Sequence, residues 1–177
     1  MQRHCECEHS KSGTLYDQSL PELEFQRGIW QAAVDNDIFR VKKLLLKGVD
    51  VNSRDSSGYT ALHYASRNEF FEMVKILIDN GACVDCVTKA GGDSPLHRST
   101  YIGNLKITEF LIKSGASIEL QNNDGQTCLH KAVQQNNKEV VKYLLSVKPN
   151  VKNIKDNKGR TPEMYCVNEE ILAMLII

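Results

Sequence analysis

The chain has 177 residues with 22 basic and 22 acidic side chains, so its formal net charge at pH 7 is zero. This balance argues against a nucleic-acid partner, because such proteins present a basic stripe to the phosphates. Hydrophobic residues make up 41% of the chain, which is enough for one domain with a core along most of its length.

The N-terminal sequence and the apolar runs predict where the protein resides. The first ten residues are polar and charged, without the apolar segment of a secretory signal. The longest apolar run, residues 171–177, is much shorter than the roughly 20 residues that a membrane-spanning helix needs. We therefore expect an intracellular protein, cytoplasmic, nuclear or both, with no membrane contact and with its six cysteines reduced.

Residues 1–18 contain few large apolar side chains and no helical period, which predicts a flexible tail. Four of its side chains are of metal-binding types and support an alternative function, a metal-binding regulatory module. Structural zinc sites, however, usually place two to four residues between cysteines and add a second ligand pair, so we expect no metal and no other cofactor. The four candidates are His4, Cys5, Cys7 and His9.

Order is expected to begin at Ser19, because Ser19 and Glu22 have the spacing of a capping box. From there a glycine recurs at intervals of 34, 33 and 34 residues, each time with Thr or Ser two residues later. Glycine suits a turn with positive φ, and Thr or Ser is a preferred helix N-cap. A period near 33 predicts a stacked repeat protein. The glycines are Gly58, Gly92, Gly125 and Gly159, and His63, His97 and His130 follow the first three.

A second helix is expected in each unit from apolar residues spaced i, i+3 and i+4, such as Val41, Leu44 and Leu45. In the fourth copy Lys148 stands where a glycine should end this helix, which leaves the exit from that repeat open. In the first three copies the helix is followed by the expected glycine, Gly48, Gly81 or Gly115.

Each unit thus consists of turn, helix, turn, helix and extended arm, and it resembles the ankyrin repeat family. Residues 55–65 match the family pattern Asp-x-x-Gly-x-Thr-Pro-Leu-His-x-Ala, and residues 74–82 match Val-x-x-Leu-Leu-x-x-Gly-Ala. The resemblance covers about residues 25–177 and implies an all-α ankyrin-repeat solenoid of helix-turn-helix units with short β-hairpin-like arms. The expected ankyrin domain, residues 19–177, comprises an N-capping repeat (about 19–57), repeats 2 to 4 (58–91, 92–124 and 125–158) and a truncated C-terminal cap (159–177).

The resemblance implies a non-catalytic module, a scaffold, adaptor or inhibitor, that binds a protein partner; we expect a monomer. The sequence contains no Gly-rich phosphate loop, nucleophile elbow or paired-carboxylate motif, so we expect no enzyme. The resemblance also gives His63, His97 and His130 a structural role, in which each imidazole bridges its own N-cap region and the adjacent turn.

In this family the arms and first helices line a concave groove, and its outward residues vary with the partner. The corresponding positions here mix Tyr and Arg, which are frequent at interface hot spots, although an ordinary solvated face is the alternative. The candidates are Tyr59, Asp93, Gln126 and Arg160 after the turn glycines, Tyr64, Arg98 and Lys131 after the histidines, and Arg67, Tyr101 and Gln134 three residues further on.

Three remaining features have both a functional and a structural interpretation. Asn52 follows Asp-Val and lies eight residues after Leu44, which matches the motif of an asparaginyl hydroxylase that acts on ankyrin arms, although Asp-Val-Asn also builds arms. Cys83 and Cys86 have C-x-x-C spacing but fall in an arm, where we expect no redox role. Part of the run 171–177 must cover the last core, and Ile176 and Ile177 either complete that cap or form an exposed interface.

Overall fold

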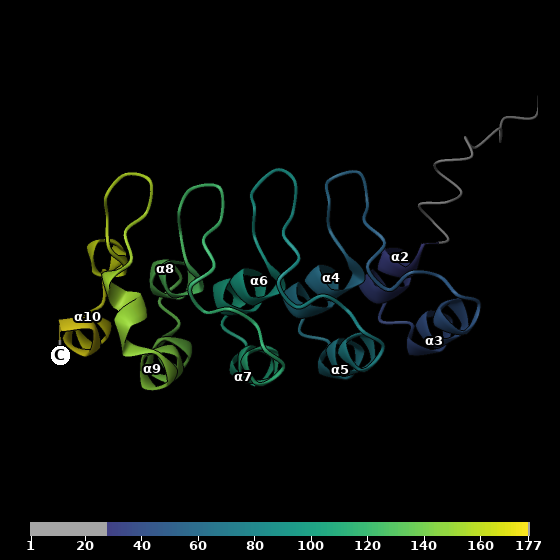
Figure 1. Ribbon diagram of the computed structural model, residues 1–177. Helices are drawn as coiled ribbons and strands as arrows, with labels where there is room; N and C mark the ends of the chain where they lie inside the picture. Colours follow the sequence, from purple (N-terminus) through teal and green to yellow (C-terminus); the bar gives the residue numbers. More distant parts are fainter. Residues whose placement is uncertain (1–27, 177) are drawn as a thin grey trace, which may run out of the picture.

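The computed structural model describes residues 28–176, which form pairs of helices stacked in a row (Figure 1). The described residues contain helices and loops but no strand, so the prediction of an all-helical solenoid is confirmed. The predicted tail and the Ser19 capping box lie outside the described residues. The first helices of the units are α2 (Ile29–Val34), α4 (Ala61–Arg67), α6 (Pro95–Ile102) and α8 (Cys128–Gln134). The second helices are α3 (Ile38–Leu46), α5 (Phe71–Asp79), α7 (Leu105–Lys113) and α9 (Lys138–Val147).

Each complete first helix begins with a variant of the capping box. Thr60, Ser94 and Thr127 are the N-cap residues, and the side chain three residues later returns a contact to the N-cap backbone. Glu or Gln usually fills that third position. Here it is a histidine. Its Nδ1 contacts the N-cap backbone, and its second nitrogen, Nε2, lies on the far side of the ring, where it can contact the next unit.

The arms between helix pairs are hairpin-shaped loops that lie side by side along one edge of the row (Figure 1). Neighbouring arm tips are joined by a backbone hydrogen bond, such as the one from the Asn157 N–H to the Asp124 carbonyl at 3.0 Å. Gly125 permits this approach, because its φ is +75° and a Cβ there would lie 2.6 Å from the backbone nitrogen of Asn157. The arms therefore stack closely without forming strands.

The exit from the fourth repeat, left open by the sequence, is a short 3-10 helix. Lys148 has φ −145° rather than the positive φ of the glycines that end α3, α5 and α7. The chain therefore continues through η1 (Pro149–Asn153) and reaches the last unit, which consists of η2 (Pro162–Tyr165) and α10 (Glu169–Ile176).

The core runs along the row between first and second helices. Leu62, Leu96 and Leu129 lie at the same position of three successive first helices and are almost completely buried, as is Ile29 in α2. At the C-terminal end Ile171 and Leu175 of α10 cover the last unit. Ile176 is exposed, and Ile177 lies outside the described residues.

Candidate protein-interaction surface

Three histidines bridge each unit to the next. The backbone N–H of Thr60 donates to Nδ1 of His63 at 3.1 Å, and on the other side of the ring Nε2 lies 3.0 Å from the carbonyl oxygen of Asp93 in the next unit. The same two contacts recur in the following units, so the histidines repeat one structural connection. The three bridges join His63 to Asp93, His97 to Gln126 and His130 to Arg160, at 3.0, 3.0 and 3.2 Å.

These contacts define the protonation state of the rings. Because Nδ1 accepts a hydrogen bond from a backbone N–H, the single proton of the neutral ring sits on Nε2 and is donated to the carbonyl of the next unit. Burial lowers the pKa of His63 to about 4, and burial also lowers the pKa values of His97 and His130. Both ring nitrogens are therefore occupied at neutral pH, which is the arrangement of a structural bridge rather than of a metal ligand or a general base.

Two of the ten groove candidates do not face outward. Asp93 and Gln126 are 8% and 7% exposed, so the expectation that they lie on the variable surface is wrong. Each is covered by the next unit, because Asn122 donates to the Asp93 carboxylate at 2.8 Å and the Gln126 amide donates to the Tyr165 hydroxyl at 3.1 Å. Their side chains hold neighbouring units together.

Arg98 links two further candidates in one cluster. Its Nη2 lies 3.1 Å from the Asp93 carboxylate and also donates to the hydroxyl of Tyr59, over whose ring the guanidinium sits at 5.1 Å from the centroid. The Tyr59 ring in turn packs on that of Tyr64, whose hydroxyl donates to Asp55 at 2.6 Å. Truncating Arg98 would leave the buried Asp93 carboxylate without its cation. Arg98 and its partner Tyr59 therefore stabilise the packing of the units in addition to lying on the candidate surface.

A second cluster of the same kind closes the C-terminal unit and includes residues that the sequence analysis missed. Arg160 lies 3.0 Å from the Asp156 carboxylate and over the Tyr165 ring, and the Tyr165 hydroxyl donates to Asp156 at 2.5 Å. The signal was the repeat register itself. Asp156 and Tyr165 lie five residues before and four residues after Thr161, the same spacing that Asp55 and Tyr64 have from Thr60.

The freest side chains of the predicted surface come from successive first helices. Arg67 and Tyr101 are exposed and Lys131 and Gln134 are half-buried, in α4, α6 and α8. Within residues 28–176 these four side chains make no hydrogen bond or ion pair. They are the groove candidates that a partner could contact without breaking an internal contact.

A small polar hollow of about 130 Å³ lies beside the C-terminal cluster. Two of its lining residues, Gln126 and Arg160, are groove candidates, although Gln126 is buried. The full lining is Asp124, Gln126, Asp156, Asn157, Lys158 and Arg160.

Asn52 holds the first two arms together. Its amide nitrogen donates to the Gly81 carbonyl at 3.2 Å, and its Oδ1 accepts the backbone N–H of Cys83 at 2.8 Å. A hydroxylase would have to draw Asn52 out of these contacts. The Asp50 carboxylate accepts the Asn52 backbone N–H at 2.9 Å, so Asp50 shapes the same turn.

The two cysteines with C-x-x-C spacing, Cys83 and Cys86, lie in the arm after α5. The Sγ atom of Cys86 accepts a hydrogen bond from Nη2 of Arg54 at 3.3 Å. Burial raises the pKa of the Cys86 thiol to about 11, which disfavours the thiolate form that redox chemistry needs. Across residues 28–176 no group of three or more His, Cys, Asp or Glu side chains could hold a metal ion. The candidates His4, Cys5, Cys7 and His9 lie outside that range.

No helix between residues 28 and 176 is both long enough and apolar enough to span a bilayer.

The stacked helix pairs with histidine bridges define a helical repeat protein. The family model for ankyrin repeats matches residues 29–122 and 100–177, and the chain therefore belongs to the ankyrin repeat family.

Three relatives show the extent of the similarity. Human ankyrin repeat domain-containing protein 39 is 45% identical over 82 residues, covering 46% of this chain and 45% of that protein. The protein of the same name from Bos taurus is 53% identical over 62 residues, covering 35% of this chain and 34% of that protein. Ankyrin repeat protein FPV031 of fowlpox virus is 36% identical over 151 residues, covering 80% of this chain and 44% of that protein. The chain thus spans less than half the length of these relatives.

Membership of the family indicates a protein–protein interaction module.

Proposed function

We propose that this chain is a non-catalytic module that binds a protein partner across the first helices α4, α6 and α8. The observation that carries the proposal is the set of free side chains Arg67, Tyr101 and Lys131, one from each helix; Arg67 and Tyr101 are the seventh residues of α4 and α6, and Lys131 is the fourth residue of α8. Their side chains lie free beside clusters that are rigidly paired. A rigid platform with free polar and aromatic side chains loses little conformational entropy when it binds.

The internal clusters give the surface its shape. Asp93 pairs with Arg98, which in turn donates to Tyr59, and Asp156 pairs with Arg160 and accepts from Tyr165. The Arg98–Tyr59 contact joins two neighbouring units, and so does the hydrogen bond from the Gln126 amide to the Tyr165 hydroxyl, so these contacts hold first helices in register with one another. The proposed contact residues therefore keep a constant spacing, which favours recognition of one partner geometry.

The proposal is tested with a triple variant, Arg67→Ala, Tyr101→Ala and Lys131→Ala, in affinity purification or proximity labelling from cells. We expect the specific partner to be lost while the fold is retained, because these side chains make no hydrogen bond or ion pair within residues 28–176. Arg98 and Tyr59 are left unchanged, because their loss would also disturb Asp93.

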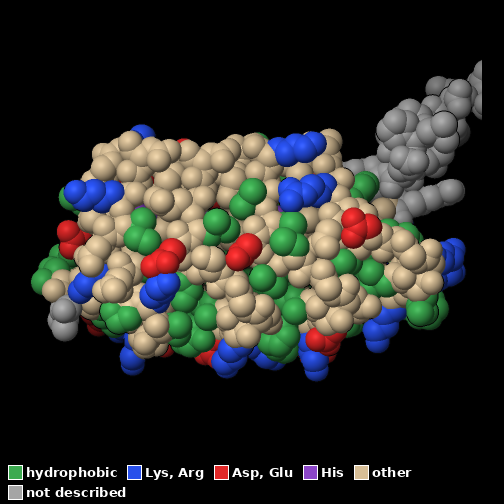
Figure 2. All heavy atoms as spheres, in the orientation of Figure 1, with side chains coloured by type: hydrophobic (Ala, Val, Ile, Leu, Met, Phe, Trp, Pro, Cys, Tyr) green, Lys and Arg blue, Asp and Glu red, His purple; other side chains and the backbone are tan. Residues whose placement is uncertain are grey.

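The matched control changes three exposed side chains of the second helices, Glu72→Ala, Lys75→Ala and Lys142→Ala. Figure 2 shows that lysine and arginine side chains gather along this lower edge, away from the arms. The control should keep the partner. Retention of the partner by the first-helix variant, or its loss from the control alone, would place the binding site elsewhere.

A further inference from the structure

The second helix of the first repeat differs from the others on the side that faces away from the stack. In interior units the third and seventh residues of this helix are apolar and fully buried, as Met73 and Leu77 are in α5. In α3 the third residue is Arg40 and the seventh, Leu44, is only half-buried. Arg40, Lys43, Leu44 and Lys47 line a hollow of about 310 Å³.

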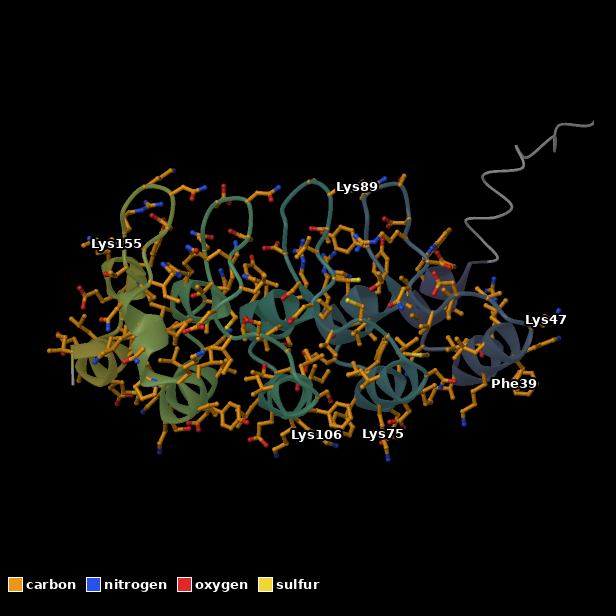
Figure 3. All side chains as sticks on the ribbon, viewed as in Figure 1. Phe39, Lys47, Lys75, Lys89, Lys106 and Lys155 are labelled. Atoms are coloured by element: carbon orange, nitrogen blue, oxygen red, sulfur yellow. The ribbon has the colours of Figure 1, made fainter. Side chains whose placement is uncertain are left out.

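Two large apolar side chains of α3 are also exposed, and one of them, Leu46, lines a second hollow with Asn80. Phe39 is 77% exposed and Leu46 is 89% exposed, and Figure 3 shows Phe39 and Lys47 pointing away from the stack at this end. The residues that correspond to Phe39 and Leu46 in α5 are Glu72 and Asp79. The α3 end, defined as Phe39, Arg40, Lys43, Leu44, Leu46 and Lys47, therefore combines exposed apolar side chains with the exposed lysines Lys43 and Lys47, while Arg40 lies 4.0 Å from the Asp35 carboxylate.

The α10 end, at the opposite end of the row (Figure 1), has the complementary character. Ile171 and Leu175 are buried and α10 packs on α9, which leaves Leu172 and Ile176 exposed together with Glu169. The α10 end, defined as Met164, Val167, Glu169, Leu172 and Ile176, is apolar and carries one exposed carboxylate, that of Glu169.

The contacts inside the stack show which residues would meet across such a junction. The first residue of one second helix touches the sixth residue of the next, since the rings of Phe71 in α5 and Phe110 in α7 are 5.4 Å apart. The first residue of one second helix also touches the second residue of the next second helix. The ammonium of Lys106 in α7 lies 3.9 Å from the centroid of the Phe71 ring in α5, and Lys138 in α9 pairs with Glu170 in α10.

Applied to the two ends, this rule places Glu169, the first residue of α10, opposite Lys43 and Phe39 of a second copy. Lys43 is the sixth residue of α3 and Phe39 is the second. A carboxylate would thus face an ammonium group at the same position where two phenyl rings meet inside the stack.

We propose that two copies of this chain associate end to end, with the α10 end of one packed on the α3 end of the other. The contact joins different surfaces of the two molecules, so it can repeat and produce rings or filaments. It replaces the expectation of a monomer. The proposed partner surface on α4, α6 and α8 is not used, so the two proposals stand or fall separately.

The test is sedimentation velocity of the full chain over an about hundredfold range of concentration, at low and high salt. The weight-average mass should rise with concentration, and salt should weaken the association because Lys43 and Glu169 are both exposed. A mass that stays at that of one chain throughout would overturn the proposal.

Charge reversal distinguishes this junction from any other. Lys43→Glu alone and Glu169→Lys alone should each weaken association by about tenfold or more, because like charges then face each other. Mixing the two single variants should restore association, and so should combining both changes in one chain. Each of these pairings again sets opposite charges against each other.

Lys75→Glu is the matched control, since Lys75 is exposed on α5 in the interior of the row (Figure 3). It should associate as the unchanged chain does. Association that survives Lys43→Glu, or that is lost in both single variants without recovery in their mixture, would contradict the end-to-end arrangement. Unfolding curves of each variant check that the fold is intact.

Discussion

At the scale of single residues, the recurring histidines are the connections on which the stack depends. Each accepts a backbone N–H of its own unit and donates to a carbonyl of the next. The imidazole can make both contacts only while it is neutral. In the protonated ring Nδ1 also carries a hydrogen, which would point at the backbone N–H that now donates to this nitrogen. The lowered pKa of His63, about 4, reflects this burial.

The histidines predict loss of stability in mild acid. The unfolded chain binds protons near pH 6.5, whereas folded His63 does so near pH 4, so stability is full above 6.5 and falls as the pH drops toward 4. For His63 the loss is on the order of 3 kcal/mol. Urea unfolding at a series of pH values between 7.5 and 4.5 measures this loss. In His63→Gln the free energy of unfolding should fall less steeply with decreasing pH. An equal slope in that variant would assign the pH dependence to other groups.

Asn52 is the residue at which a modification is expected. Its amide bridges two arms, so hydroxylation requires the first arm to open. Mass spectrometry after co-expression with the asparaginyl hydroxylase should show one added oxygen on Asn52, and Asn52→Ala should abolish it. Asn122, a buried asparagine in a later arm, serves as the internal control and should stay unmodified. An unmodified Asn52 would contradict the prediction.

At the scale of elements, the repeat pattern predicted the helices well because their signals are local. N-cap residues, turn glycines and apolar spacing each act within one unit, and α4, α6 and α8 begin directly after the predicted Thr60, Ser94 and Thr127. The burial of Asp93 and Gln126 could not be predicted from such local signals, because it depends on contacts with the next unit, from Asn122 to Asp93 and from Gln126 to Tyr165. The 3-10 exit after Lys148 likewise depends on the shape of the last unit.

The arms offer a test at this scale that separates two effects of glycine. Gly115 and Gly125 both have positive φ, but a Cβ at Gly115 would meet nothing within 4 Å, whereas one at Gly125 would lie 2.6 Å from the Asn157 backbone. Gly115→Ala should therefore cost about 1 kcal/mol through backbone strain alone. Gly125→Ala should cost clearly more, as measured by the free energy of unfolding in urea. Equal losses would show that the arms can separate freely.

At the scale of the whole molecule, the main helix contacts within residues 28–176 join neighbouring units, so this part of the chain forms a row whose outer helices are α3 and α10. The α3 end carries the exposed Lys43, the α10 end carries the exposed Glu169, and both carry exposed apolar side chains, which is the basis for the proposed end-to-end association. The first helices between them carry the proposed partner surface. Binding along the row and assembly at its ends can therefore occur independently.

The central claim is that α4, α6 and α8 carry the partner surface, and the most direct measurement is the equilibrium affinity of a purified partner. The account predicts that Arg67→Ala, Tyr101→Ala and Lys131→Ala together weaken binding by about tenfold or more, while Glu72→Ala, Lys75→Ala and Lys142→Ala leave it unchanged. An affinity that is equal for the unchanged chain and the first-helix variant would contradict the account.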